Sequence, residues 1–407
     1  MKVLHTSDWH LGKKLYKTSR LDEQRLFLDY LIQTIQEKSI EVLVMAGDLF
    51  DVPRPSDESL TLYFQFLKKL QEETNAVFCL ISGNHDSGRF LDAPKPLLDL
   101  NRFFVAGKFQ GAESLKKVTL KGTQGETLEL TLLPFFRSTD LLELDKAEPN
   151  KENLEVGERL LLSLQRLIQS APKENQNQKK ILVAHHLFGD STPCGTEQGL
   201  HLSGLQSVPL QFLKGHYDYV ALGHIHRAQC LQKSNPIINY SGSPLPFRFG
   251  EKGRKKIFIY DSLTDEVETI ELPEWRKLKT IQTTSGQMIE DLKREIAKGV
   301  DANLFELWEI RCEIDKPSAG LADLARELTR NENLEILSFQ TFITQDGTQT
   351  LEQSSKRSGL KDYSTEKLFE VYYQEKFPQS SGPSERLRQE FKELLELVRL
   401  DHLREEE

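Results

Sequence analysis

The sequence predicts an α/β fold, with a layered sandwich followed by a small α+β module and a tail of two helices. Over residues 1 to about 272, short apolar runs alternate with stretches of helical periodicity, which is the pattern of a layered α/β domain. The length of 407 residues indicates two or three domains, at roughly 150 residues each. We therefore expect domains over 1–272, 275–345 and 364–407, with a linker over 346–363.

The elements of the first region follow from residue spacing. Apolar side chains recur at helical intervals around Phe27–Ile35, Leu60–Leu70 and Leu160–Ile168. Short apolar runs predict buried strands at Val3–Leu4, Val42–Met45, Val77–Ile81, Leu128–Leu133, Ile181–Ala184 and Val220–Leu222. Three more strand patterns close the region and are candidates for a second sheet: Ile237–Tyr240, Lys256–Tyr260 and Val267–Leu272.

From about Trp275 the pattern becomes β-α-β-α-β. Strands are predicted at Leu278–Thr283, Leu304–Ile314 and Leu334–Ile343, with helices around Met288–Ile296 and Leu321–Leu328. A polar stretch with glycine and serine then predicts the linker. Two amphipathic helices finish the chain, one over about Thr365–Phe377 and one that begins near Ser384, a residue suited to an N-cap.

Composition excludes several classes of protein. Apolar residues make up 38% and charged residues 28%, as in soluble globular proteins. The apolar runs are far shorter than the ~20 residues that cross a bilayer, and the polar start predicts no signal peptide. Four cysteines without CxxC spacing indicate reduced thiols in a cytoplasm. The net charge of −9 argues mildly against nucleic acid, but that sum omits bound metals and local basic patches.

Polar residues with metal-ligand character gather in five short clusters, each a few residues after a predicted strand. The clusters are Asp8–His10, Gly47–Asp51, Gly83–Asp86, His185–His186 and Gly223–His226, and they contain six of the ten histidines. In an open α/β sheet, loops that follow the strands lie along one edge, where ligands bind. Imidazoles together with carboxylate and amide oxygens suit Mn²⁺, Fe²⁺ or Zn²⁺, and this number of ligands suits a pair of ions.

In order along the chain, the motifs DxH, GDxxD, GNHD, a strand-ending His and GHxH resemble those of the calcineurin-like dimetal metallophosphoesterases. The segments Leu222–Gln229 and Tyr240–Pro246, with Ser7–Gly12, are similar to the SbcD family of exonuclease subunits. That family also has a small capping domain and a helical tail, so the resemblance covers nearly the whole chain. It implies a layered metallophosphoesterase sandwich over residues 1–272 and a capping domain that binds DNA over 275–345.

The resemblance implies two metal sites that share a bridging ligand. Their residues are Asp8, His10 and His226 for one ion, Asn84, His185 and His224 for the other, and Asp48 as the bridge. His186 is an alternative to His185, which we favour because it directly ends the strand. His85 would act on the phosphate ester, as a general acid or by positioning it, and Asp51 would orient His85. Manganese is the implied metal, with magnesium as the alternative.

The resemblance also implies partners. They are DNA ends and hairpins, an SbcC-type coiled-coil ATPase on which the helical tail docks, and a second copy of the chain, which gives a heterotetramer or larger assembly. The implied activities are those of an ATP-dependent double-strand 3'-5' exonuclease and a single-strand and hairpin endonuclease. They would serve DNA repair, replication and recombination, at the nucleoid in the cytoplasm. Because no GxxxxGK[ST] segment occurs, ATP would act only through the partner.

Several interpretations remain open from the residues alone. The basic group Lys13–Arg20 is predicted to contact DNA phosphates. The aromatic stripe at Tyr63 and Phe64 suits either the core or a dimer interface. Two other functions compete with a nuclease: a small-molecule or nucleotide phosphodiesterase with the same dimetal site, and a structural clamp without activity.

Overall fold

The computed structural model describes residues 1–98, 101–111, 115–122, 125–137, 140–141, 156–170, 178–192, 207–299, 304–315, 320–343, 373 and 387. The predicted linker and nearly all of the predicted helical tail lie outside these residues. Within this part of the chain, no helix is both long and apolar enough to cross a membrane.

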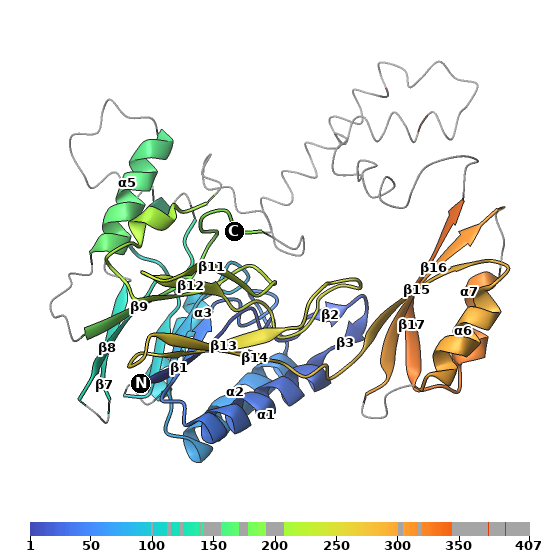
Figure 1. The fold of residues 1–407 in the computed structure, drawn as a ribbon, viewed down its shortest axis with the longest axis horizontal. Helices are drawn as coiled ribbons and strands as arrows, with labels where there is room; N and C mark the ends of the chain where they lie inside the picture. The colour runs from blue at the N-terminus through green and yellow to red at the C-terminus, as the bar shows by residue number, and fades with distance from the viewer. Residues whose placement is uncertain are drawn as a thin grey trace. The chain divides into compact units, whose positions relative to one another are not determined.

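Two six-stranded sheets form the centre of the first domain (Figure 1). The first sheet has the order β14 (Glu266–Glu271), β13 (Lys256–Asp261), β1 (Lys2–Thr6), β4 (Val42–Ala46), β5 (Val77–Ile81) and β6 (Phe103–Ala106). The second has the order β11 (Gln229–Lys233), β12 (Ile237–Tyr240), β10 (Tyr219–Gly223), β9 (Gln178–His185), β8 (Thr127–Leu132) and β7 (Lys116–Lys121). The strands that precede the five polar clusters are parallel within each sheet.

The two sheets pack face to face, and helices cover their outer faces. Side chains from β1, β4 and β5 meet side chains from β8, β9 and β10 in a common apolar core, for example Val44 with Val183 and Ala221. On the far side of the first sheet lie α1 (Leu21–Lys38) and α2 (Asp57–Glu73). On the far side of the second sheet lies α5 (Val156–Gln169) (Figure 1). This is the layered α/β sandwich that the sequence predicted.

Local signals in the sequence explain where the two long helices begin. Helix α2 starts after Ser56, whose hydroxyl accepts a hydrogen bond from the Ser59 amide at 3.4 Å, and Asp57 and Glu58 occupy its first turn. Helix α1 also carries acidic residues in its first turn, Asp22 and Glu23, and ends at a left-handed Ser39. Acidic side chains there interact favourably with the positive end of the helix dipole.

Residues 278–343 form a separate three-stranded sheet with two helices. The order along the chain is β15 (Leu278–Thr284), α6 (Met288–Ala297), β16 (Glu306–Ile314), α7 (Leu321–Thr329) and β17 (Leu334–Ile343), as the β-α-β-α-β pattern indicated. Strands β15 and β16 are parallel. Trp308, Met288 and Leu292 are fully buried in a core of its own, so this module has the layered organisation of a small domain.

The structure differs from the expected grouping of the last three strands of the first region. They do not form a sheet of their own: β12 pairs with β10 in the second sheet, whereas β13 and β14 extend the first sheet beside β1. The remaining short elements are β2 (Lys14–Leu15), β3 (Thr18–Ser19), α3 (Gly88–Asp92) and the 3₁₀ turns η1 (Lys95–Leu97) and η3 (Leu210–Phe212). The predicted ligand loops consequently leave two facing sheets, not a single open one.

Candidate metal centre

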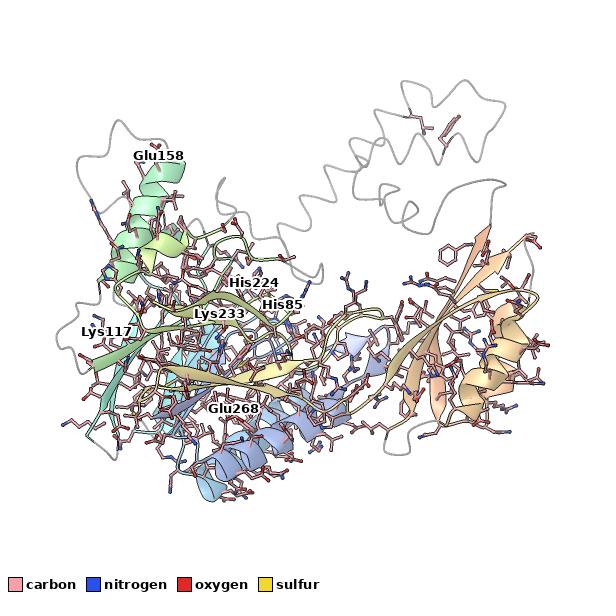
Figure 2. All side chains as sticks on the ribbon, viewed as in Figure 1. His85, Lys117, Glu158, His224, Lys233 and Glu268 are labelled. Atoms are coloured by element: carbon pink, nitrogen blue, oxygen red, sulfur yellow. The ribbon has the colours of Figure 1, made fainter. Side chains whose placement is uncertain are left out.

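The polar clusters from both sheets meet at one edge of the sandwich. Asp8 and His10 follow β1, Asp48 follows β4, and Asn84 follows β5, all in the first sheet. His185 ends β9, and His224 and His226 follow β10, in the second sheet. Backbone hydrogen bonds hold the loops together, with the Asp8 amide donating to Gly47 O and the His10 amide to Asp48 O, both at 3.0 Å. His85 and His224 mark the region in Figure 2.

Four of these residues have a backbone conformation that is unusual for residues other than glycine. The φ angles are 52° at Asp8, 45° at His10, 56° at Asp48 and 100° at His224. Such left-handed conformations are energetically costly and persist only where the surrounding structure enforces them, which occurs often at functional sites. Four of the eight positive φ angles at described non-glycine residues thus fall on residues that the motifs single out.

Close approach explains two of the cluster glycines. A Cβ atom on Gly83 would lie 2.1 Å from Oδ1 of Asp48, and one on Gly47 would lie 2.3 Å from Nδ1 of His185. Both distances are far below van der Waals contact, so only glycine allows the loop backbones to approach these side chains.

Asp48 lies between the two groups of predicted ligands. Its Oδ2 is 3.4 Å from Nε2 of His10 and 3.3 Å from Nε2 of His185. Its Oδ1 accepts a hydrogen bond from the backbone amide of His85 at 2.9 Å. A carboxylate with one predicted ligand on each side has the position that a bridging ligand requires.

The first group contains Asp8, His10, Asp48 and His226, whose ligand atoms all lie within 4.8 Å of one another. All four side chains are buried, and the Nε2 atoms of His10 and His226 are 3.2 Å apart. Two buried carboxylates beside neutral imidazoles are unfavourable unless a cation compensates their charge. The donor set therefore fits a divalent ion of the Mn²⁺, Fe²⁺ or Zn²⁺ type.

The second group is centred on the amide oxygen of Asn84. This Oδ1 lies 3.2 Å from Nε2 of His185 and 3.1 Å from Nδ1 of His224. The ring of His185 is held in place by its other nitrogen, because Nδ1 donates to the backbone oxygen of Ala46 at 2.7 Å. That hydrogen bond leaves the lone pair of Nε2 directed at Asn84 and Asp48, an arrangement typical of metal-binding histidines.

His186 lies outside both groups. Its Nε2 accepts a hydrogen bond from the Phe136 amide at 3.4 Å, and its ring packs against those of Phe135 and Phe136 at centroid distances of 5.0 and 3.9 Å. Burial holds its pKa well below the usual value, which keeps the ring neutral in these apolar surroundings. The geometry therefore favours His185 over His186 as the ligand.

His85 and Asp51 contact each other in a way that the sequence did not indicate. Nδ1 of His85 lies 2.8 Å from the backbone oxygen of Asp51 and donates to it. The Asp51 carboxylate instead lies 3.2 Å from Nδ1 of His10 and 2.6 Å from Nζ of Lys13. The main chain of Asp51 thus orients His85, while its side chain holds His10.

The electrostatics of the buried groups reflect this crowding. Burial, with the charge of Asp48 adding to it, raises the pKa of Asp8 to about 7. Burial alone would lower the pKa of His185, but the charge of Asp48 and their hydrogen bond raise it to about 9. Burial tends to raise the pKa of Asp51, yet hydrogen bonds from His10 and Lys13 bring it down to about 2. Because Asp8 and Asp48 repel each other, a bound cation would stabilise both as carboxylates.

Two supporting residues were missed by sequence reasoning. The carboxylate of Asp86 accepts hydrogen bonds from the amides of Gly83, Leu49 and Phe50 at 2.9–3.1 Å, and so ties two ligand loops together. Asp86 is the last residue of the GNHD motif, but the motif alone did not indicate its role. Phe247 packs its ring 5.0 Å from that of His10 and 4.9 Å from that of His226, measured between centroids. No motif marks Phe247, because its role depends on packing alone.

Comparison with known proteins places this geometry in context. The family of calcineurin-like phosphoesterases matches residues 1–228. The SbcD subunit of nuclease SbcCD from Escherichia coli (strain K12) is 27% identical over 365 residues, which cover 80% of this chain and 89% of that protein. The protein of the same name from Bacillus subtilis (strain 168) is 29% identical over 315 residues, covering 76% of this chain and 79% of its own length. A solved dimetal phosphatase from Danio rerio aligns with 67% of this chain and 99% of its own, at 12% identity and a TM-score of 0.40.

Proposed function

Since this chain belongs to the calcineurin-like phosphoesterase family and is a metal-dependent phosphodiesterase, we propose that it is the nuclease subunit of an SbcCD-type complex. Its substrate would be DNA, cut at phosphodiester bonds of ends and hairpins. The observation that supports the proposal is the convergence of ligand groups from both sheets around Asp48. The similarity to two nuclease subunits over most of the chain supports the choice of DNA.

The residues fit two divalent ions, for which we propose Mn²⁺. Asp8, His10 and His226 would hold one ion, Asn84, His185 and His224 the other, and Asp48 both. When bound, the ions would supply positive charge to the phosphoryl oxygens and acidity to an attacking water. The Asp51 carboxylate contacts Nδ1 of His10, and the backbone oxygen of Ala46 accepts a hydrogen bond from Nδ1 of His185. These contacts fix the orientation of both rings before a substrate arrives.

His85 is the proposed catalytic residue that acts on the ester. Its Nδ1 proton is held by the backbone oxygen of Asp51, so Nε2 is the atom available to the substrate. In the protonated ring, Nε2 can donate its proton to the leaving oxygen, and in either state it can position the phosphate. The backbone amide of His85 donates to Asp48, which fixes the loop relative to the metal ligands.

Partners and domains follow from the same proposal. Residues 275–345 would act as a capping domain that contacts DNA, and residues 364–407 would dock on a coiled-coil ATPase of the SbcC type. ATP would then drive the exonuclease on duplex DNA, in the cytoplasm at the nucleoid. Near the ligand loops, Lys14 and Lys17 are exposed and can reach DNA phosphates at the surface.

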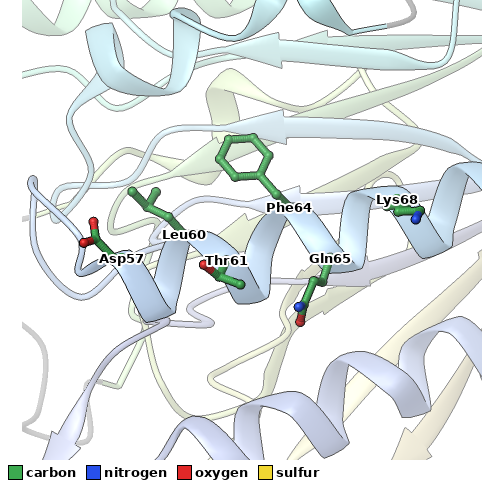
Figure 3. Close-up of a pocket in the computed structure, with 6 residues that line it drawn as sticks. All are labelled: Asp57, Leu60, Thr61, Phe64, Gln65 and Lys68. Carbon is green, nitrogen blue, oxygen red and sulfur yellow. The ribbon is translucent and has the colours of Figure 1, made fainter.

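We also propose a homodimer formed through α2. Phe64 is 45% exposed and borders two pockets, one of about 580 Å³ along α2 and one of about 290 Å³ that also includes Phe50, Tyr63 and Phe90. Figure 3 shows Leu60, Phe64 and Lys68 in succession along α2, with Phe64 projecting from it. An exposed aromatic beside apolar hollows is suited to an interface with a second copy.

The deciding experiment is digestion of end-labelled linear and hairpin DNA by the purified chain with Mn²⁺. We expect the wild type to cleave DNA and His85→Ala to lose at least about 100-fold in rate. His216→Ala, a histidine substitution outside the ligand clusters, should retain the activity and serves as the matched control. Turnover of bis-p-nitrophenyl phosphate without DNA cleavage, even with the ATPase partner and ATP, would instead indicate a small-molecule phosphodiesterase.

A further inference from the structure

A cavity of about 290 Å³, which shares no lining residue with the two pockets beside Phe64, lies beside the loop that follows β12 and the segment that leads into β15. Among the described residues that line it, none belongs to the predicted metal ligands or catalytic residues. Five basic side chains, Arg20, Arg248, Arg254, Lys255 and Arg276, border it, against two acidic ones, Glu251 and Glu274. The lining therefore has a positive excess in a protein whose net charge is −9.

The inner wall is built from two buried arginines that share one carboxylate. Arg20 and Arg276 are each 3% exposed, and Glu23 between them is fully buried. Nε of Arg20 lies 2.5 Å from Oε1 of Glu23, and Nε of Arg276 lies 3.1 Å from Oε2. One negative charge thus faces two positive charges, and this buried cluster keeps an uncompensated positive charge.

The same arginines have hydrogen-bond donors without acceptors. Nη1 of Arg20 donates to the backbone oxygen of Pro246 at 2.7 Å, but its Nη2 has no hydrogen-bond partner among the described residues. Nη1 of Arg276 likewise lacks one, and its guanidinium lies 4.2 Å from the ring of Phe305. Buried donors of this kind are rarely left unsatisfied, because each loses its hydrogen bonds to water without a replacement. An anion in the adjacent cavity would satisfy both the donors and the charge.

Not every basic group of the lining is open to a ligand. Nζ of Lys255 donates to Glu251 at 2.7 Å, to Ser243 Oγ at 2.9 Å and to the backbone oxygen of His226 at 3.0 Å. Arg254 lies 3.4 Å from Glu271, but its side chain is 77% exposed and that pair is weak. Arg20 and Arg276 would therefore make the specific contacts, with Arg254 contributing at the rim.

We propose that this cavity is a binding site for a phosphate group. Two guanidinium groups match the planar, bidentate hydrogen bonding that phosphate oxygens favour. At about 30 Å³ per water, the cavity has room for a phosphate with several waters. The phosphate is either a backbone phosphate of nucleic acid or a free phosphate ion. The inference does not depend on the nuclease activity, because it concerns the metal-free chain and residues outside the metal centre.

Trp275 lines the cavity and provides the readout. The other two tryptophans, Trp9 and Trp308, are fully buried, so a ligand in the cavity acts mainly on the fluorescence of Trp275. Inorganic phosphate is titrated into the metal-free chain in EDTA, at constant ionic strength set with chloride. We expect a saturable change in fluorescence, absent in Trp275→Phe, together with a rise in Tm that Trp275→Phe retains. No saturable change and no rise in Tm relative to chloride would overturn the proposal.

Four variants separate binding from folding. Arg276→Gln should weaken phosphate binding about tenfold or more, and the exposed Arg254→Gln by a smaller factor of about 2–3. Glu23→Gln removes the shared negative charge and should tighten binding, a change opposite in sign to that caused by loss of structure. Lys233→Gln removes an exposed charge at the other end of the β11–β12 pair and should bind as the wild type does (Figure 2). Equal affinity in Arg254→Gln, Glu23→Gln and the wild type would exclude this cavity as the site.

Competition then identifies the source of the phosphate. An unphosphorylated hairpin oligonucleotide that displaces inorganic phosphate in the wild type would identify a backbone phosphate of DNA as the ligand. Phosphate binding that persists at saturating oligonucleotide would identify a free phosphate ion as the ligand. Both results support the site, and they differ only in what occupies it.

Discussion

At the residue scale, His185 and His186 are neighbours in the chain with opposite surroundings. His185 faces Asp48 and Asn84, whereas His186 packs against two phenylalanines. We expect His185→Asn to reduce Mn²⁺ affinity at least about 100-fold, because a proposed ligand is lost. His186→Gln should bind Mn²⁺ within a few-fold of the wild type. Titration calorimetry on the metal-free proteins measures both, and the reverse order of effects would exchange the two assignments.

Gly83 gives a second prediction at the same scale. Alanine there would place Cβ 2.1 Å from Oδ1 of Asp48, so either Asp48 or the loop must move. Since Asp48 is the proposed bridge between the two ligand groups, we expect Gly83→Ala to lose about 100-fold or more in Mn²⁺-dependent phosphodiester hydrolysis. Gly286→Ala is the matched control, because a Cβ at Gly286 meets no atom within 4 Å. Equal activity in the two variants would show that the loop adapts without displacing Asp48.

The sequence predicted which residues gather, but not every contact between them. Asp8, Asp48 and His224 could be found because each stands in a short motif directly after a strand. The bond from His85 to the main chain of Asp51 could not, because every residue carries the same backbone oxygen and only the fold decides which one is presented. The shared position of Arg20 and Arg276 around Glu23 also escapes prediction from the sequence, since more than 250 residues separate the arginines.

At the element scale, the sequence patterns missed three of the described strands of four or more residues, β6, β7 and β11, and of these only β6 (Phe103–Ala106) is a continuous apolar run. Strands β7 and β11 lie at opposite edges of the second sheet, and Val118 of β7 is the single buried residue in the two strands. Edge strands are commonly polar, which protects a sheet from pairing with other chains but removes the signal of burial. The sequence also could not predict that β12 and β13 belong to different sheets, because the residue pattern of a strand does not specify the strand with which it pairs.

His5 links β1 of one sheet to β10 of the other and gives a prediction about pH. Its Nδ1 accepts from the Tyr219 hydroxyl at 2.9 Å, and its Nε2 donates to the Leu222 backbone oxygen at 3.2 Å. Burial lowers its pKa from 6.5 to about 3. Between these values the unfolded chain binds a proton at this residue and the folded chain does not. His5 therefore contributes stability above pH 6.5 that is lost as pH falls toward 3, by up to about 1.4 kcal/mol per pH unit.

The measurement is urea unfolding of metal-free wild type and His5→Gln at several pH values from 8 to about 5. The difference between the two free energies of unfolding should shrink as pH falls, since glutamine does not titrate. Subtracting the variant also cancels the pH dependence that other titrating groups contribute to both proteins. Asp8 is one of these groups, and its raised pKa makes the folded state more stable as pH falls. A difference that stays constant with pH would contradict the prediction.

At the scale of the whole molecule, the proposed homodimer predicts a change in mass with one substitution. Phe64→Glu places a charge at the exposed aromatic that borders both pockets of α2, and an unpaired charge in an interface is strongly unfavourable. Analytical ultracentrifugation should show a dimer for the wild type and a monomer for the variant. Leu263→Glu, at a residue that is 49% exposed in the turn between β13 and β14, controls for added charge. A wild type that is monomeric at micromolar concentration would refute the proposal.

Because the predicted ligands come from both sheets, metal binding should stabilise the entire sandwich. Asp8, Asp48 and Asn84 belong to the first sheet, and His185 and His224 to the second, so each ion would join the two layers. A ligand that binds only the folded state adds about 2.7 kcal/mol at a concentration of 100 times its dissociation constant. We therefore expect Mn²⁺ to raise the Tm by about 5–10 °C and EDTA to reverse the rise.

Two variants connect that stabilisation to the predicted ligands. His85→Ala should keep the rise in Tm, because His85 is proposed to contact the substrate and not the ions. Asp48→Asn should lose most of the rise, since the Asp48 carboxylate lies between the two ligand groups and is their proposed bridge. Differential scanning calorimetry with and without Mn²⁺ measures both effects. A rise in Tm that is equal in all three proteins would mean that the metal binds elsewhere, and the assignment of this edge of the sandwich as the metal centre would then be wrong.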